Sequence, residues 1–507
     1  MLLSLIVFTP LLAILILTFV PRHKGDLIKK VGVLGTLPPL LLSLLLFVSF
    51  NYELSGLQFA EKAKWISIPV GTLQSGAIFS FDLGYEMGVD GISMPLIVLT
   101  AIIATLAAVA SWNQKKRLKE YFILFHLLLI GMLGVFASQN LFLFFIFFEL
   151  TLIPTYFLIG IWGYGEREKA ANKFLLYNGI GSGVMLIAFI VLFMYLNTMN
   201  MEAIANLLGS VNHPAALALT PALRFGLFLA IFIAFAVKLP VFPFHTWMLK
   251  VHVQAPPAIV MLHSGILLKM GAYGLLRMGI GFFPEQAYQF ATWMAVLGLI
   301  NLLYGALLAF VQKDLKMVMA YSSISHMGIV LLGFAAMNTI GFQGAMFQVV
   351  SHGFISALLF FLIGMIWERT QTSMIDEMGG LAKVMPFASG IMLAGAMASL
   401  GLPGMSGFIS EFFAFLGLFG KMPVLAAIGA IGIVLTAAYL LRAILRTTFG
   451  PTPDRFTGVA DAQPMEVIPL VVLLGFIILI GVYPAVLANP LQQTLKTIVP
   501  IVTGIGG

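Results

Sequence analysis

Apolar residues run through this chain in blocks of about 18 to 25, and each block ends at charges, proline or glycine. A helix of about 20 apolar residues crosses a hydrocarbon core of about 30 Å, so every block predicts one membrane-spanning helix. We expect about fourteen such helices by this length rule, near residues 2–20, 31–49, 92–112, 121–138, 140–162, 172–196, 222–239, 255–278, 286–309, 317–336, 343–367, 387–420 (broken), 424–446 and 466–488. The pattern therefore predicts an all-α polytopic membrane protein.

The composition of the 507 residues agrees with this pattern and excludes a soluble globular enzyme. Hydrophobic residues make up 60% and charged residues only 9%, whereas soluble domains carry roughly 25% charged residues. The chain has no cysteine, so it can hold neither a disulfide nor a thiolate-bound iron–sulfur cluster. Any electron transfer therefore needs another chain or a cofactor without cysteine ligands.

The basic residues are divided unequally between the two sides of the predicted bundle. If the N-terminus lies outside, 19 of the 27 lysines and arginines fall in inside loops, 6 fall outside and 2 lie within spans. Because cytoplasmic loops carry the basic excess, this bias predicts that both termini lie outside. The first apolar block lacks a small-residue cleavage site, so we expect a retained helix rather than a signal peptide. The only sizeable outside loop, residues 50–91, is expected to pack over the helix ends.

A carboxylate and a lysine lie within predicted spans, where charge is costly. Glu149 sits in the run FFIFFELT (residues 144–151), too deep for its short side chain to reach water. Lys238 is followed by Pro240 and Pro243, which break the helix, and a break at membrane depth typically lines a cavity. Charges at helix centres cost about 2.5 to 3.5 kcal/mol on insertion scales and usually mark functional sites. Each residue also has a structural alternative to a functional role. Glu149 could be a structural carboxylate that a neighbouring helix satisfies, and the Lys238 side chain could extend to the membrane interface.

Lys269 and three histidines add candidate proton carriers on other helices. Apolar residues continue for about a turn and a half on each side of Lys269, and a lysine buried in this way can bind and release a proton. His263, His326 and His352 also lie in spans, and an imidazole ring can take a proton at one nitrogen and release it at the other. Each histidine alone could equally serve helix packing, but three in one bundle favour a relay.

A second broken helix carries another carboxylate. Residues 399–407 read SLGLPGMSG, including Pro403, and Glu411 follows one turn after the break. Both breaks contain a Leu-Pro step beside an ionisable group, and paired interruptions of this kind point to inverted repeats. We therefore divide the chain into N-terminal helices (1–112), a first five-helix repeat (113–278), a second inverted repeat (279–450) and a C-terminal helix with its tail (451–507).

Other kinds of site are not supported by the pattern. The run GIGSG at residues 179–183 follows no strand, so it indicates small-residue helix packing rather than a dinucleotide loop. Nothing in the sequence is typical of a metal site, a bis-histidine haem or a hydrolase elbow. The net charge of +7 is explained by basic inside loops and does not indicate nucleic-acid binding.

Several segments in fixed order resemble the antiporter-like membrane subunits of respiratory complex I and of the Mrp sodium/proton antiporters. They read FELTLIP (148–154), KLP (238–240) with PFHTW (243–247), HVQAP (252–256), LKMGAYG (268–274), DLK (314–316) with AYSSISHMG (320–328), and LPGMSGF (402–408). The resemblance covers residues 90 to 450 and is greatest to the M-type chain. In that type the second broken helix carries a glutamate, which Glu411 matches, where the L-type, N-type and Mrp chains usually carry a lysine.

The resemblance implies a role for each buried ionisable residue. Glu149 and Lys238 would form the ion pair of the first half-channel, and Lys269 would lie at the centre of a water axis in the membrane plane. The implied proton-translocating residues are Glu149, Lys238, Lys269, His326, His352 and Glu411. The implied supporting or hinge residues are Pro240, Pro243, His245, His263 and Pro403. No catalytic redox site, metal or cofactor is expected in this chain.

The resemblance also implies a function and partners. The chain would translocate protons as a non-redox, membrane-arm subunit of an NADH:quinone oxidoreductase, driven by quinone reduction in another subunit. Flavin, iron–sulfur clusters and quinone are expected in partners, among them L-, N- and K-type subunits, with lipid but no nucleic acid. A bacterial plasma membrane is the expected location. The alternatives are an Mrp-type sodium/proton antiporter subunit and a structural scaffold with inert buried charges.

Overall fold

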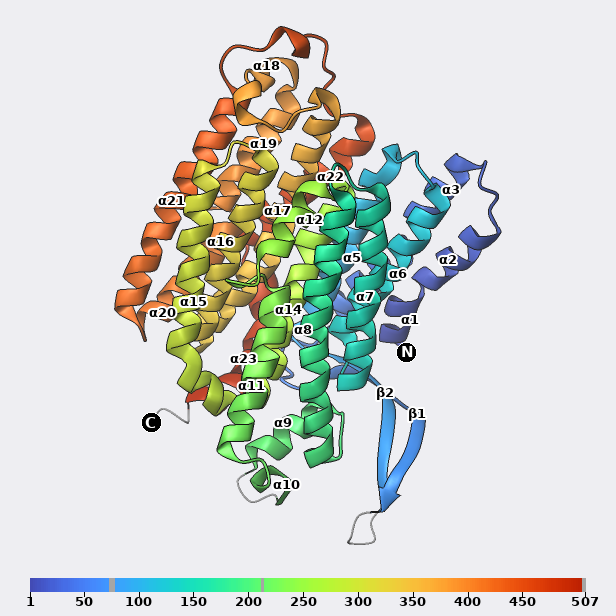
Figure 1. The fold of residues 1–507 in the computed structure, drawn as a ribbon, viewed down its shortest axis with the longest axis vertical. Helices are drawn as coiled ribbons and strands as arrows, with labels where there is room; N and C mark the ends of the chain where they lie inside the picture. The colour runs from blue at the N-terminus through green and yellow to red at the C-terminus, as the bar shows by residue number, and fades with distance from the viewer. Residues whose placement is uncertain (73–77, 211–213, 504–507) are drawn as a thin grey trace.

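The computed structural model describes residues 1–72, 78–210 and 214–503, and this part of the chain is a bundle of long apolar helices (Figure 1). Thirteen helical segments in it are long and apolar enough to cross a membrane. They are α1–α2 (Leu2–Phe8, Pro10–Phe19), α3–α4 (Gly25–Leu34, Leu37–Ser49), α5 (Ser93–Ala110), α6 (Leu118–Ala137), α7 (Leu141–Trp162), α8 (Arg167–Leu196), α11 (Pro221–Lys238), α13–η2–α14–η3 (Pro257–Leu262, His263–Leu267, Leu268–Gly274, Leu275–Ile280), α15 (Pro284–Val311), α16 (Leu315–Ala335), α17 (Thr339–Thr370), α21 (Pro423–Thr448) and α22 (Pro464–Val482).

Two shorter apolar helices, α19 (Pro386–Ser399) and α20 (Ser406–Phe419), fill the stretch expected as one broken span. Together with the thirteen long segments they confirm the predicted polytopic helical fold and its span count. The remaining helices of the described chain are short or lie at the bundle ends: α9 (Met201–Gly209), α10 (Pro214–Leu217), α12 (Thr246–Gln254), α18 (Leu381–Val384) and α23 (Ala485–Thr503). The sequence did not predict α23, which follows the last expected span.

Polar residues at the helix starts and small residues at the crossings explain this packing. Asn140 and Asn338 accept hydrogen bonds from backbone N–H groups in the first turns of α7 and α17, which satisfies donors that a helix start leaves open. A Cβ atom on Gly344 of α17 would lie 2.2 Å from the backbone nitrogen of Ala414 in α20. Glycine therefore allows these two helices to touch, as small residues do in membrane bundles.

The centre of the bundle is formed by α17 and by the segment Pro257–Ile280. These two are the spans whose apolar windows are fully buried by the rest of the chain, whereas the windows of α21 and α1–α2 are only 33% buried. Figure 1 places α14 and α17 near the middle of the bundle. Lys269 lies on the segment Pro257–Ile280 and His352 on α17, so the two face the interior of the bundle and not lipid.

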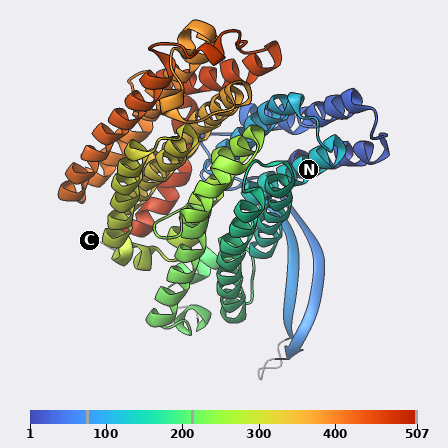
Figure 2. The same cartoon turned by 45° about the horizontal axis from the view of Figure 1, so that its top comes forward.

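The loop expected to pack over the helix ends is instead a β-hairpin. Strands β1 (Gln58–Thr72) and β2 (Ile78–Val89) pair antiparallel, contact α1, α6 and α7 at their base, and extend away from the bundle (Figures 1 and 2). Charged residues interrupt the apolar ones here, as at Glu61, Lys62 and Lys64. That pattern is too polar for a span, and pairing with a distant strand satisfies its backbone.

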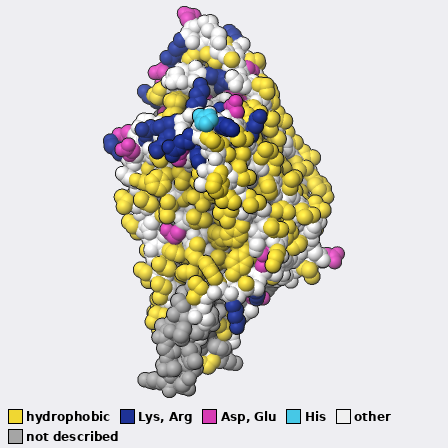
Figure 3. All heavy atoms as spheres, turned by 90° about the vertical axis from the view of Figure 1, so that its right-hand side faces the viewer, with side chains coloured by type: hydrophobic (Ala, Val, Ile, Leu, Met, Phe, Trp, Pro, Cys, Tyr) yellow, Lys and Arg dark blue, Asp and Glu magenta, His cyan; other side chains and the backbone are white. Residues whose placement is uncertain are grey.

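The surface of the bundle is a hydrophobic belt with basic side chains at one end (Figure 3). Lysine and arginine side chains gather beyond the belt at that end (Figure 3). In the sequence, the loops that were expected inside contain basic residues such as Lys24, Lys115 and Arg167. This distribution is that of a multi-pass membrane protein. The assignment of that side to the cytoplasm stays a prediction, as does the division into two inverted repeats.

Candidate functional site

The first helix break lies between α11, which ends at Lys238, and α12. Pro240 and Pro243 occupy the break, and Asn301 of α15 binds the backbone groups that the break exposes. The Asn301 amide donates to the Pro240 carbonyl at 3.2 Å, and its Oδ1 accepts from the Phe242 N–H at 2.7 Å. Irregular backbone at membrane depth needs such partners because no water is available there. Asn301 was not predicted, although a polar residue within an apolar run was the available signal.

Lys238 is buried, and its Nζ lies over two aromatic rings. The rings belong to Phe148 and Phe174, with centroids 4.9 and 5.7 Å away. Aromatic faces attract a cation and can hold it without a carboxylate. One oxygen of Glu149 is buried without a hydrogen-bond partner, and Glu149 attracts the lysine electrostatically. No ion pair within 4.0 Å joins Glu149 and Lys238 among the described residues, so the expected direct contact is not formed in this structure.

His263 has a partner that the sequence analysis did not assign. Its Nδ1 lies 2.9 Å from Nε2 of His252 on α12, and both rings are buried. The outer nitrogens, Nε2 of His263 and Nδ1 of His252, have no hydrogen-bond partner. One hydrogen bond therefore joins the two rings, and the outer nitrogen of each ring is open. When one outer nitrogen binds a proton, the other can release one. The position of His252 in the segment HVQAP was the only signal for it.

Aromatic rings lie between this histidine pair and its neighbours. The Phe174 ring that contacts Lys238 is also 5.9 Å from the ring of His263. On the other side, the ring of His252 is 4.7 Å from that of Phe360. Phe360 in turn lines a small cavity beside His352. The histidine pair therefore lies between Lys238 and the central residues.

Lys269 lies at the centre, on a helix that changes its winding. Helix α14 carries it between two π-helical turns, η2 and η3, a form that is rare and often found at functional sites. Its Nζ donates to the carbonyl of Ser264 and lies 2.8 Å from Nδ1 of His352 on α17. The structure thus brings two predicted residues, 83 positions apart in sequence, into direct contact.

His326 continues this line on α16. Its ring centroid is 5.3 Å from that of His352. Its Nδ1 lies 2.7 Å from the carbonyl oxygen of Ser322, and its Nε2 lies 2.9 Å from that of Ser399. A carbonyl oxygen only accepts hydrogen bonds, so both contacts are satisfied together only when both ring nitrogens carry hydrogen. This geometry fits a ring that holds a positive charge.

Glu411 of α20 lies beside His326, close enough to pair with the ring when both groups are charged. Its Oε1 is 3.8 Å from His326 Nε2, and both side chains are buried. The second break lets the Glu411 carboxylate lie close to the backbone at Gly401. Gly401 has a φ of +79°, which favours glycine, and a Cβ atom there would lie 2.7 Å from Glu411 Oε2. Pro403 lies in the same break, between α19 and α20.

A small cavity lies beside His352. It has a volume of about 10 Å³ and is lined by the serine residues Ser322, Ser323, Ser356 and Ser399 together with His352. That volume is about what one water molecule needs, and hydroxyl groups are suitable partners for it. The cavity therefore offers a place for a bridging water between α16, α17 and the second break.

His245 forms no hydrogen bond with the other predicted residues in the part of the chain that the structure describes. It lies in the first break, is buried against the rings of Phe242 and Tyr304, and neither of its ring nitrogens has a hydrogen-bond partner. Among the described residues, no group of three or more histidines, aspartates or glutamates could hold a metal ion.

The site is a series of single titratable side chains that runs from Glu149 to Glu411 across the bundle.

Two family models match this chain, one after the other. Residues 138–436 match the family described as "NADH:quinone oxidoreductase/Mrp antiporter, TM", and residues 33–136 match "NADH-ubiquinone oxidoreductase chain 4, amino terminus". A relative in Picosynechococcus sp., named NAD(P)H-quinone oxidoreductase chain 4 1, is 41% identical over 501 residues, which are 96% of this chain and 90% of that protein. The NAD(P)H-quinone oxidoreductase chain 4 of Gloeobacter violaceus is 40% identical over 95% of this chain and 89% of its own.

Solved structures show the same fold. A chain of respiratory complex I from Thermus thermophilus with bound NADH superposes with a TM-score of 0.83 at 29% identity, over 99% of this chain and 100% of that chain. A chain of the Mrp complex from Dietzia sp. superposes with a TM-score of 0.82 at 20% identity, over 100% of this chain and 98% of that chain. The second likeness concerns the fold alone.

Proposed function

This chain belongs to the NADH:quinone oxidoreductase/Mrp antiporter family as a chain-4-type subunit of the complex I membrane arm, and we propose that it conducts protons along its buried line of titratable residues. The observation that carries this proposal is the contact of Lys269 with His352, continued by His326 and Glu411. Charged groups inside a membrane bundle are costly and typically mark ion pathways.

The proposed path begins where Lys238 and Glu149 attract each other without contact. A change of field along the membrane arm would move these charges toward or away from each other and alter the affinity of Lys238 for its proton. The proton then passes to the pair His263 and His252, whose inner nitrogens share a hydrogen bond and whose outer nitrogens are open. It then reaches Lys269 at the centre.

The second half of the path runs from Lys269 to the carboxylate of Glu411. His352 takes the proton at Nδ1, and the serine-lined cavity offers a water between His352 and the next histidine. His326 holds the charge between two carbonyl oxygens, opposite Glu411. Glu411 would release the proton on the outer side, and the residues of this chain need no redox chemistry for any of these steps.

The substitution Lys269→Met tests the proposal. Methionine keeps an unbranched chain in the central position but cannot carry a proton, so vesicles containing the complex should move fewer protons for each electron transferred. Lys421→Met is the matched control, because Lys421 has a buried Nζ without a hydrogen-bond partner, lies over the Tyr288 ring, and follows the end of α20 outside the line of contacts. An unchanged ratio of protons to electrons in Lys269→Met would overturn the proposal.

The same proposal includes the surroundings of the chain. We expect L-, N- and K-type membrane subunits as neighbours, and flavin, iron–sulfur clusters and quinone in partner subunits. We place the chain in a bacterial plasma membrane with both termini outside. Sodium-dependent transport in the absence of quinone reduction would instead favour the Mrp-type antiporter.

A further inference from the structure

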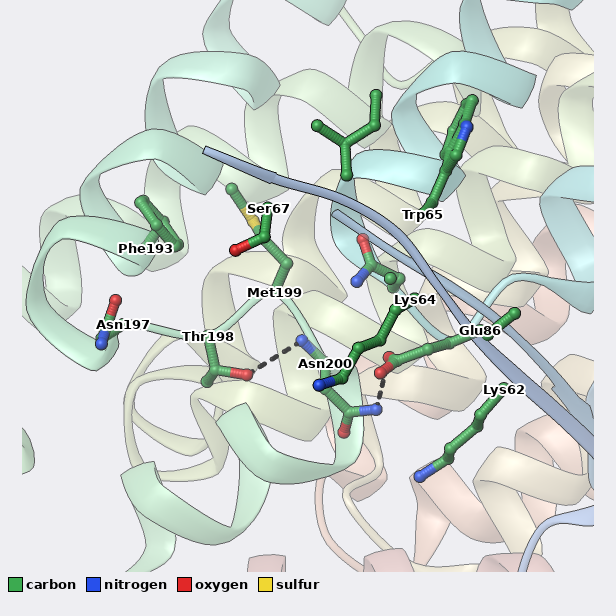
Figure 4. A pocket seen from close by; sticks show the side chains of 14 residues that line it. Lys62, Lys64, Trp65, Ser67, Glu86, Phe193, Asn197, Thr198, Met199 and Asn200 are labelled. Atoms are coloured by element: carbon green, nitrogen blue, oxygen red, sulfur yellow. Dashed lines mark hydrogen bonds between the residues drawn. The ribbon is translucent and has the colours of Figure 1, made fainter. Parts of the chain in front are cut away.

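A cavity of about 540 Å³ lies between the β-hairpin and the end of α8 (Figure 4). Its wall on the hairpin side includes Lys62, Lys64 and Glu86, and its wall on the helix side includes Asn197 and Asn200. Ligand sites typically have volumes of about 300 to 1,000 Å³, so this cavity is large enough to hold a small polar group. Nothing in the proposed proton path uses it.

The charge in this cavity favours an anion. Lys62 and Lys64 are two residues apart on β1, so both side chains lie on the same face of the strand. Neither forms an ion pair within 4.0 Å among the residues that the structure describes. Glu86 is already bound, because its carboxylate accepts a 2.6 Å hydrogen bond from the side-chain amide of Asn200 (Figure 4). The cavity therefore contains two open positive charges against one engaged negative charge.

The cavity lies at the end of a helix that is long and apolar enough to cross a membrane. Helix α8 crosses the bundle from Arg167 and ends at Leu196, next to the cavity. Within α8, before that end, the side chains of Met194 and Ile187 are 65% and 64% exposed, as residues that face acyl chains would be. Trp65, at the cavity wall, is 55% exposed. Aromatic residues of this kind are enriched where a membrane meets water.

We propose that this cavity binds the headgroup of an anionic phospholipid from the adjoining leaflet. Lys62 and Lys64 hold the phosphate, and the amides of Asn197 and Asn200 offer hydrogen bonds to its polar substituent. The acyl chains lie along the exposed apolar face of α8. A bound lipid of this kind would connect the base of the hairpin to the helix bundle.

A photo-crosslinkable phosphatidylglycerol tests this proposal in the assembled complex. After illumination, mass spectrometry should find the label on peptides that contain residues 62–67 or 197–200. The variant K62Q/K64Q should lower the labelling of these peptides about 25-fold at subsaturating lipid, since each lysine near the surface contributes about fivefold to binding. The variant K24Q/K30Q is the matched control, because it removes two exposed lysines at the opposite end of the bundle and should leave the labelling unchanged.

Three competitors distinguish the possible occupants. Unlabelled phosphatidylglycerol should displace the label, whereas phosphatidylcholine and inorganic phosphate should not. Displacement by inorganic phosphate at the same concentration would show a site for soluble anions and overturn the lipid proposal. Equal labelling with a phosphatidylcholine probe, or unchanged labelling in K62Q/K64Q, would also overturn it. So would the absence of any label on these peptides, because a partner protein would then fill the cavity.

Discussion

Replacing Glu411 with glutamine tests the last step of the proposed path. Glutamine keeps the size and the hydrogen-bonding capacity of the side chain but removes its negative charge. In the structure the carboxyl oxygen Oε1 lies 3.8 Å from Nε2 of His326, whose ring is held between two carbonyl oxygens. The substitution therefore removes the counter-charge that an ionised Glu411 would offer to a protonated His326, while the breaks and the helix packing stay in place.

The expected magnitude follows from that distance. Two unit charges 3.8 Å apart attract each other by about 4 kcal/mol at an effective dielectric constant of about 20. Because each 1.36 kcal/mol corresponds to a factor of ten, arrival of a proton at His326 becomes up to about 1,000-fold less favourable. Any water in the neighbouring cavity would screen the attraction and reduce this factor. Proton transfer through this chain is thus expected to fall, with about 1,000-fold as the upper limit.

The assay is proton uptake into vesicles that contain the whole complex, measured together with electron transfer in the same sample. Glu411→Gln should lower the ratio of protons moved to electrons transferred. Glu466→Gln is the matched control, because Glu466 is also a buried carboxylate and pairs with Arg369 at 2.6 Å, outside the line. The control should lower stability and leave the ratio unchanged. Normal proton movement in Glu411→Gln would refute the role of the His326–Glu411 contact.

Further predictions concern the histidine pair and a buried ion pair at the base of the hairpin. His263→Gln should slow proton transfer, because glutamine can keep the hydrogen bond but cannot carry the proton, whereas His126→Gln, at another buried histidine, should not change transport in the same vesicle assay. Asp90→Asn should lower the free energy of unfolding by at most about 3 kcal/mol in thermal denaturation, because it leaves Arg277, whose side chain is 17% exposed, without its counter-charge. Burial acts to raise the pKa of Asp90, but the Arg277 guanidinium holds it below its usual value. The stabilisation is therefore present above about pH 4 and is lost as the pH falls through the lowered pKa, so the thermal midpoint should fall on acidification in the unaltered chain and much less in Asp90→Asn.

The sequence predicted the helices well because each span is specified locally. A run of apolar residues long enough to cross the membrane has no stable alternative to a helix there, so its position follows from composition alone. The same argument indicated that Lys269 is buried, since apolar residues continue for about a turn and a half on each side of it. Burial of a single residue is a local property and can be inferred without knowing its neighbours.

Contacts between helices could not be predicted in this way. The contact of Lys269 with His352 depends on the rotation of two helices about their axes, which packing of all their neighbours determines. The pairing of His252 with His263 depends in addition on the turn between α12 and α13. The β-hairpin was missed for a related reason, because its strands satisfy their backbone only by pairing with each other across a loop.

The irregular backbone of this bundle supplies acceptors to the groups that carry charge. Ser399 ends α19 at the second break, and its carbonyl oxygen, which no longer lies within a continuing helix, is bound by His326. Ser264 lies in a π-helical turn, and Lys269 donates to its carbonyl oxygen. A free carbonyl inside a membrane costs energy until a donor binds it, and a cationic side chain is the strongest donor available. The same irregular turns that weaken these helices therefore provide sites where a positive charge can rest, which explains why broken and π-helical segments coincide with the line of titratable residues.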